Sequence, residues 1–557
     1  MHTKRLAAAM LGLALAATAC GTTGQTAGQS GSGSSQAQAA EQVLRIPLGG
    51  EPATLDPNQA TDSISITVLT QLVRPLVYFD ADLNTVPEGG LAESWELSAD
   101  GMTVTFHLKD GLTYSDGSPI VADDFVTSWK RLIDPRTAAG YSYVMLDIAG
   151  ANDVYGADPE DDAAVETALE SFGVAAPDEA TFVVTLGHPA AYFVSIATLW
   201  VTAPIREDFE FGEAEGYVGS GPFVMSEWNH EENITLVPNE HWTAGPAAPP
   251  DLTIEMPVIA DPAQALAAYE NNEVDLVGVP SADVERVRAD EVLSQQVVQG
   301  DVLSLEYYGF DMRDSSVFGK SKELRHAFSQ AVDKETLIET LRNGIGTVAG
   351  SAVPPGMPGH QPDLGLAYDP AAATAAFEAG LTEAGVTLDD IDTELQLGYN
   401  TEADHEPTVE YLQEQWRTAF GVTVELVGLE WSSYLTRLNE DPFDIFRLGW
   451  GADYPHPNNF LTDLFTCQSG NNNMKYCNED FDAAMADAAV DPDLDAQVAI
   501  YNQAQETLVE EAPVIFISWG GRFTLVKPWV SGLTITPSDF TTGAYFFTNI
   551  TIAEHEE

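Results

Sequence analysis

Short apolar runs bounded by turn residues alternate along this chain with segments whose apolar residues recur at helical intervals. Val43–Leu48 and Met102–Leu108 have the length and pattern of strands. Ser63–Val77 carries apolar residues at helical spacing, and Val121–Arg131 and Ala496–Leu508 predict further helices. Strands and helices are therefore mixed along the whole chain.

One stretch combines a predicted strand with two opposite charges. Phe443–Leu448 predicts a strand that breaks into Gly449-Trp450-Gly451, where missing Cβ atoms let another backbone approach. At about 3.3 Å per residue, Arg447 and Asp453 would lie roughly 15–20 Å apart. A zwitterionic peptide alongside could place its ammonium at Asp453 and its carboxylate at Arg447. The alternative is a strand bulge with a core Trp450 and a solvated turn at Asp453.

Length and charge restrict the class of protein. The 557 residues suggest three or four domains, and 23 Lys+Arg against 86 Asp+Glu give a net charge of −63. Such a surface repels nucleic acid and bare anionic lipid, so we expect neither as a partner. A salty habitat and an exported protein both fit the dispersed acids.

The N-terminus indicates export. Lys4 and Arg5 precede an apolar run that is too short for a membrane span, so residues 1–19 are expected to be a signal peptide. Cys20 follows small residues, as in the lipobox of bacterial lipoproteins, although Ala17 stands where Leu is usual; the alternative is a plain cleaved signal. Residues 20–41 contain no large apolar side chain and predict a flexible linker.

Cys467 and Cys477 are the only other cysteines. In an oxidising compartment, a pair ten positions apart indicates a disulfide that closes a surface loop. A metal site with His456 is the weaker alternative.

Enzyme motifs are incomplete wherever they begin. Gly219-Ser220-Gly221 lacks the outer glycine of a nucleophile elbow, and His230–Ile234 lacks the second histidine of a zinc helix. Asp491–Asp495 lacks the glycine of a calcium loop, and Gly344–Gly346 follows a predicted helix and lacks the nucleotide-binding pattern. We therefore expect no catalytic activity.

A series of short motifs follows in order along nearly the whole chain. The motifs are Glu51–Pro57, Leu91–Glu96, Asp100–Leu108, Ser115–Pro119, Asp123–Arg131, Gly219–Phe223, Leu324–Lys334, Asn471–Asp482 and Glu510–Ile515. Together they resemble the extracellular solute-binding proteins that capture oligopeptides for ABC importers. Each motif is weak alone, whereas the ordered set is highly specific.

The resemblance implies an α/β fold: a two-lobed periplasmic-binding-protein clamp of the larger, three-domain type that closes on its ligand by a hinge. The expected parts are a discontinuous lobe I of residues 42–77, 203–305 and 522–557, an inserted small domain of residues 78–202, and lobe II of residues 306–521.

The resemblance also assigns the ligand site. Asp453 would receive the α-ammonium of a peptide, and Gly449 and Trp450 would pair with its main chain. Arg447 stands where peptide binders place an arginine for the ligand carboxylate, and Trp431 matches a pocket aromatic whose alternative is core packing.

Two departures from the family affect the expected peptide length and carboxylate placement. Thr127 stands where the family often has a tyrosine near the ligand. A second arginine expected downstream of Trp431 falls on Leu438, with Arg437 one position away.

The resulting hypothesis is a monomeric receptor, lipid-anchored through Cys20 on the outer side of the cell membrane, that delivers short peptides to an ABC permease. No cofactor or metal is implied. The nearer alternative is the same fold with a non-peptide solute: a nickel chelate, haem, an opine or an oligosaccharide. The farther one is a surface hydrolase or chaperone.

Overall fold

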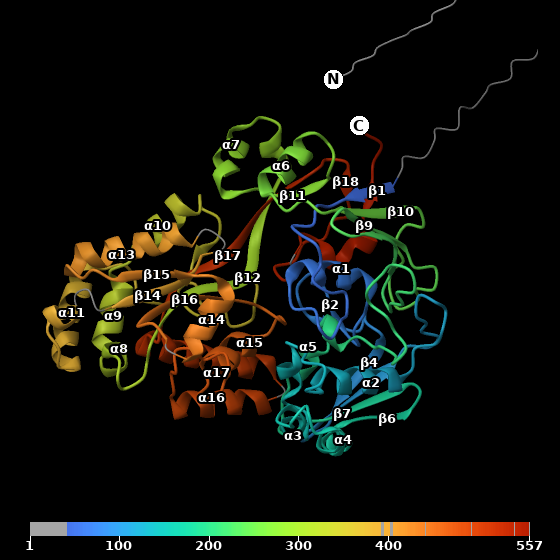
Figure 1. Cartoon of the computed structure of the whole chain (residues 1–557), viewed down its shortest axis with the longest axis horizontal. Helices are drawn as coiled ribbons and strands as arrows, with labels where there is room; N and C mark the ends of the chain where they lie inside the picture. Colours follow the sequence, from blue (N-terminus) through green and yellow to red (C-terminus); the bar gives the residue numbers. More distant parts are fainter. Residues whose placement is uncertain are drawn as a thin grey trace, which may run out of the picture. The chain divides into compact units, whose positions relative to one another are not determined.

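The computed structural model describes residues 42–391, 395–401, 405–440, 442–491, 493–539 and 541–555 (Figure 1). The expected signal peptide, Cys20 and the whole expected linker of residues 20–41 lie outside these residues. The chain from Ala40 onward is one unit by its contacts, and the domain boundaries expected within it stay a prediction. Among the described residues, none of the helices has both the length and the apolar character that a bilayer crossing requires.

Three sheets carry the fold. The first has the order β1 (Gln42–Arg45), β10 (Leu252–Pro257), β9 (Asn233–Pro238) and β8 (Phe223–Asn229). The second has the order β4 (Ala92–Leu97), β5 (Thr103–Leu108), β7 (Thr181–Thr185) and β6 (Val174–Asp178). The third has the order β11 (Leu276–Gly278), β17 (Val514–Val526), β12 (Val297–Phe310), β16 (Ile445–Gly451), β14 (Gln396–Asn400) and β15 (Glu425–Leu429), with β13 (Thr347–Val348) beside β17.

Two small ribbons and the helices complete the described chain. The ribbons pair β2 (Tyr78–Phe79) with β3 (Thr85–Val86) and β18 (Val530–Ser531) with β19 (Thr551–Ile552). The α-helices are α1 (Ser63–Leu72), α2 (Ala122–Ile133), α3 (Ala151–Tyr155), α4 (Asp162–Ser171), α5 (Phe193–Ile196), α6 (Pro262–Glu270), α7 (Val284–Ala289), α8 (Val317–Lys320), α9 (Lys322–Gln330), α10 (Lys334–Leu341), α11 (Pro370–Ala384), α12 (Leu388–Ile391), α13 (Glu406–Phe420), α14 (Trp431–Glu440), α15 (Asn458–Phe465), α16 (Glu479–Val490) and α17 (Leu494–Glu511). The 3₁₀ turns are η1 (Ser142–Met145), η2 (Trp200–Thr202), η3 (Ser281–Asp283), η4 (Leu293–Gln296) and η5 (Ala544–Asn549).

Separate apolar clusters cover the two faces of the seven-stranded sheet. Tyr308 of β12 packs in one cluster with residues of α9, α11 and α13, including the fully buried Trp416. Its neighbour Tyr307 packs in the other cluster with residues of α14, α15 and α17 (Figure 1). The strict alternation of a strand thus fills both layers.

Two predicted elements differ from the structure. The helix expected over Ser63–Val77 ends at Leu72, because Val73 is extended and Arg74 precedes Pro75, which disfavours helical geometry. The strand expected to break after Leu448 continues to Gly451, because β12 pairs with it along its whole length.

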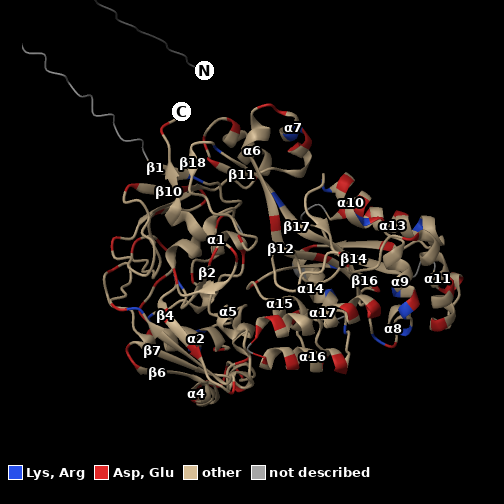
Figure 2. Ribbon diagram, turned by 180° about the vertical axis from the view of Figure 1, so that it is seen from behind, with Lys and Arg blue, Asp and Glu red and all other residues tan. Residues whose placement is uncertain are grey.

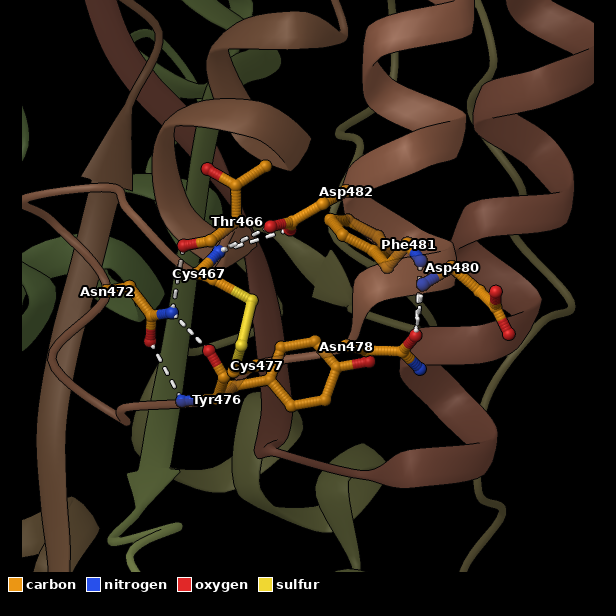
Figure 3. Close-up of a disulfide and its surroundings, with 9 residues drawn as sticks. All are labelled: Thr466, Cys467, Asn472, Tyr476, Cys477, Asn478, Asp480, Phe481 and Asp482. Atoms are coloured by element: carbon orange, nitrogen blue, oxygen red, sulfur yellow. Dashed lines mark hydrogen bonds between the residues drawn. A yellow bond between two sulfur atoms is a disulfide. The ribbon is translucent and has the colours of Figure 1, made fainter.

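Cys467 and Cys477 form a disulfide, with an S–S distance of 2.06 Å (Figure 3). The Asn472 side chain organises the loop that this disulfide closes. Its Nδ2 donates to the carbonyl oxygens of Thr466 and Tyr476. Bonded sulfurs are not thiolate ligands, and no group of three or more potential metal ligands gathers in the described chain. The metal alternative for these cysteines is therefore wrong.

Acidic side chains outnumber basic ones on elements throughout the described chain (Figure 2). They are not gathered in one segment.

Candidate functional site

The Asp453 side chain lies just beyond the end of β16 and meets two tyrosines from a distant part of the chain. The Tyr141 hydroxyl donates to Oδ1 at 3.0 Å, and the Tyr143 hydroxyl donates to Oδ2 at 2.7 Å. Tyr141 precedes η1 and Tyr143 lies within it, so one short turn delivers both donors. Sequence reasoning missed both tyrosines.

Asn459, in the first turn of α15, holds Asp453 from the other side. Its Nδ2 donates to Asp453 Oδ2 at 3.0 Å, and its Oδ1 accepts the Asp453 backbone N–H at 2.8 Å. The same Oδ1 accepts the Trp450 indole N–H at 3.1 Å, and Nδ2 also donates to Asp463 Oδ2 at 2.9 Å. One amide therefore fixes the strand end, the indole and two carboxylates.

The electrostatics of this site favour a cation. Burial raises the pKa of Asp453, although its hydrogen bonds from Asn459, Tyr143 and Tyr141 act in the opposite direction. Burial, with the charge of Asp453 adding to it, raises the pKa of Asp463 to about 7. No described Lys, Arg or His lies within 4 Å of Asp453, and all its side-chain donors are neutral. An ammonium group would supply the missing positive charge.

Next to Asp453, one edge of β16 is open. On one side β16 pairs antiparallel with β12, from Ile445 opposite Phe310 to Gly451 opposite Ser304. On the other side β14 pairs only with Ile445 and Phe446. No strand of the described chain continues this second edge.

The open edge presents backbone groups of two glycines. The Tyr434 hydroxyl donates to the Arg447 carbonyl at 2.6 Å on this side, whereas the Ala452 N–H donates to β12 at 2.7 Å. Because successive residues of a strand alternate sides, Gly449 and Gly451 direct their N–H and C=O groups to the open edge. An extended peptide could add there as a strand.

Arg447 lies in an ion network rather than at an open surface. Its Nε is 3.7 Å from Glu306 Oε1, and Arg342 Nη2 contacts Glu306 Oε2. A Cβ placed on Gly449 would lie 3.4 Å from Arg447 Nη2, so the guanidinium sits over the glycine. Two guanidiniums share one buried carboxylate, which leaves the network with one net positive charge.

Trp431 opens α14 and is 42% exposed, so the core-packing alternative for it is wrong. Its ring centroid lies 6.1 Å from that of Tyr434. Leu438 is buried, whereas Arg437 donates to Gln396 Oε1 and lies over the Phe443 ring. The place of the family's second arginine is thus part of the core.

Thr127 lies on α2 in the wall of a different cavity, which Lys130 and Arg131 also line. The tyrosines at Asp453 come instead from the segment around η1. Position 127 thus lies in another cavity than Asp453, and its bearing on peptide length stays a prediction.

Comparison with known proteins agrees with the fold and with the family that the motifs resemble. A model of the family described as "Bacterial extracellular solute-binding proteins, family 5 Middle" matches residues 86–472. The oligopeptide-binding protein OppA of Bacillus subtilis is 28% identical over 524 residues, which cover 91% of this chain and 92% of that protein.

Two solved structures share the α/β fold over more than nine-tenths of the chain. The murein tripeptide binding protein MppA of Escherichia coli superposes with a TM-score of 0.73 at 26% identity, covering 93% of this chain and 99% of that one. Haemophilus influenzae OppA, solved as a complex with RPPGFSPFR, gives a TM-score of 0.73 at 26% identity, covering 92% and 99%. The α/β periplasmic-binding-protein fold expected from the sequence is confirmed.

Proposed function

The chain belongs to the bacterial extracellular solute-binding proteins of family 5, a family of binding proteins and not of enzymes, and we propose that it captures short peptides by their free amino end. One observation carries this proposal. The Asp453 carboxylate is enclosed by neutral donors, has no described cation within 4 Å, and adjoins an unpaired strand edge. A peptide supplies both missing partners, an ammonium group and a main chain. The names of the similar proteins, OppA and MppA, also refer to peptides.

The free energy of binding expected from these contacts suits reversible capture of a peptide. A hydrogen bond to a charged group contributes about 1.5–3 kcal/mol. Main-chain pairing at Gly449 and Gly451 would add affinity without reading side chains, which allows many peptide sequences. Arg447, with Arg342 and Glu306 behind it, would attract the carboxylate end through the net positive charge of that network. Trp450 and the exposed Trp431 would supply apolar contact.

Around this site we further propose the cellular setting. The two expected lobes would close over the peptide and open to release it to the membrane subunits of an ABC importer. Diacylated Cys20 would hold the protein on the outer side of the cell membrane through the linker of residues 20–41.

Thermal melts of the purified protein with free and N-acetylated tri-alanine test the proposal. A ligand at 100 times its Kd stabilises the folded state by about 2.7 kcal/mol. We expect the free peptide to raise the Tm. The N-acetylated peptide, which has no ammonium group, should leave the Tm unchanged. Equal shifts would exclude the Asp453 anchor, and no shift with free peptides of any length would exclude the peptide function.

Asp453→Asn sharpens the test. Loss of one partner of a buried ion pair costs roughly 3–5 kcal/mol, so we expect calorimetry to show peptide affinity at least about 100-fold weaker. Asp153→Asn, which removes an exposed carboxylate on α3, is the matched control and should bind as the unaltered protein does. Unchanged affinity in Asp453→Asn would contradict the proposal.

A further inference from the structure

A small cavity beside Asp453 also contains the side chain of Arg74. Tyr78, Trp200 and Tyr545 contribute to its walls. It has free space for about one water molecule, so a ligand group would enter when the walls separate. The cavity places a carboxylate and a guanidinium around one space.

Arg74 is buried, and the carboxylate that lines the same cavity is that of Asp453. It is 4% exposed, and no carboxylate of the described chain lies within 4 Å of its guanidinium nitrogens. Its Nη1 donates to the Thr70 carbonyl at 3.0 Å, its Nε has no acceptor, and its guanidinium carbon lies 4.2 Å from the centre of the Tyr78 ring. The carbonyl and the ring offset only part of the cost of burying a charge.

Other buried arginines of this chain do have acids beside them. Arg325 lies 3.6 Å from Glu511, and Arg522 lies 3.6 Å from Asp539. With 86 acidic residues in the sequence, a carboxylate for Arg74 would be easy to supply. Among the buried arginines of the described chain, Arg74 alone has no carboxylate within 4 Å.

We propose that Arg74 determines specificity by binding a carboxylate that the ligand carries close to the ammonium group held at Asp453. The inference rests on the proposed peptide function and narrows its substrate class. Two sources have this chemistry: an acidic side chain on the first residue of a peptide, and the terminal carboxylate of a dipeptide. Without Arg74, either group would be repelled by Asp453 and by Asp463 behind it. Arg447 differs, because Glu306 already balances part of its charge.

Calorimetry on the full-length chain in mild detergent tests the inference with two peptide pairs. Glu-Ala-Ala against Gln-Ala-Ala reports the side-chain source, and Ala-Ala against Ala-Ala-amide reports the terminal source. Whichever of the two carboxylates Arg74 binds, the peptide that carries it should bind about 10-fold more tightly than its neutral partner. Arg74→Gln should abolish or invert that ratio. Arg74→Lys, which keeps the positive charge, should retain part of the preference for the carboxylate peptide.

Arg417→Gln, which removes a surface guanidinium from α13, is the control for net charge and should keep the ratio. A preference in either pair that Arg74→Gln removes supports the inference and identifies the source. Tight binding of all four ligands with no preference in either pair overturns it while leaving the peptide function intact. A preference that survives Arg74→Gln also overturns it. Binding of none of them would also overturn it, and the melts with longer free peptides would then decide the peptide function separately.

Discussion

Two carboxylates, Asp453 and Glu306, lie near the paired strands β16 and β12 in opposite surroundings. Glu306 stands opposite Gly449 and meets two guanidiniums, those of Arg342 and Arg447. Asp453, just beyond β16, meets two phenols and one amide. The first carboxylate has its counter-charges within the protein, and the second has hydrogen-bond donors without a counter-charge.

The pKa directions follow from this difference. Burial alone would raise both values. For Glu306, the charges of Arg342 and Arg447 outweigh burial and lower the pKa, whereas for Asp453 the neutral donors do not, and the pKa is raised. A completed ion network stabilises the fold, while a carboxylate held only by neutral donors is prepared for a cation from outside.

Glu306→Gln should give the largest effect on stability. Removing the shared carboxylate leaves two half-buried guanidiniums unbalanced, which we expect to cost roughly 3–5 kcal/mol of the free energy of unfolding. Urea denaturation of the ligand-free protein measures it. Asp453→Asn, the matched variant, should lose little or become more stable, because it removes an uncompensated charge. Similar losses of unfolding free energy in Glu306→Gln and Asp453→Asn would show that the two carboxylates do not differ in this way.

Asp463→Asn should show a pH-dependent effect. An acid whose pKa rises to about 7 on folding holds a proton that the unfolded chain releases near pH 4, so the stability that it contributes falls as pH rises between these values. At pH 8 the variant, which escapes this loss, should be more stable than the unaltered protein by up to about 4 kcal/mol. The two should converge near pH 4. A difference that does not vary with pH would show that Asp463 stays ionised.

Tyr143→Phe should give the smallest of the three effects. It removes one donor to a charged acceptor, a contact that contributes about 1.5–3 kcal/mol. We expect a lower Tm of the ligand-free protein and a further rise in the pKa of Asp453, followed by its carboxyl NMR signal. Thr127→Val, on α2 in the wall of another cavity, is the control and should leave that pKa unchanged. An unaltered Asp453 titration in Tyr143→Phe would show that the hydroxyl contact is unimportant.

Local pattern was enough for the predicted strands and helices, whereas the resemblance to the family was needed to select Asp453 as a candidate anchor. It was not enough for the end of β16, because pairing with β12 outweighs the weak strand preference of Gly449 and Gly451. Tyr141 is 312 positions from Asp453, so their contact exists only after folding and has no local signature. Arg74 was missed for a related reason: a sequence shows a charge, but not whether it is buried or what lies beside it.

The open edge of β16 has a consequence for self-association. Backbone groups that would accept an extended peptide would accept equally a strand of another copy of the chain, the contact by which sheets grow into aggregates. We expect three features to keep strands of another copy from pairing here and to leave room only for short peptides. The unpaired stretch is short, it contains two glycines that disfavour strand structure, and Tyr141 and Tyr143 contact the carboxylate at its end. The groups proposed to position a peptide's ammonium would thus also limit fibril-like growth.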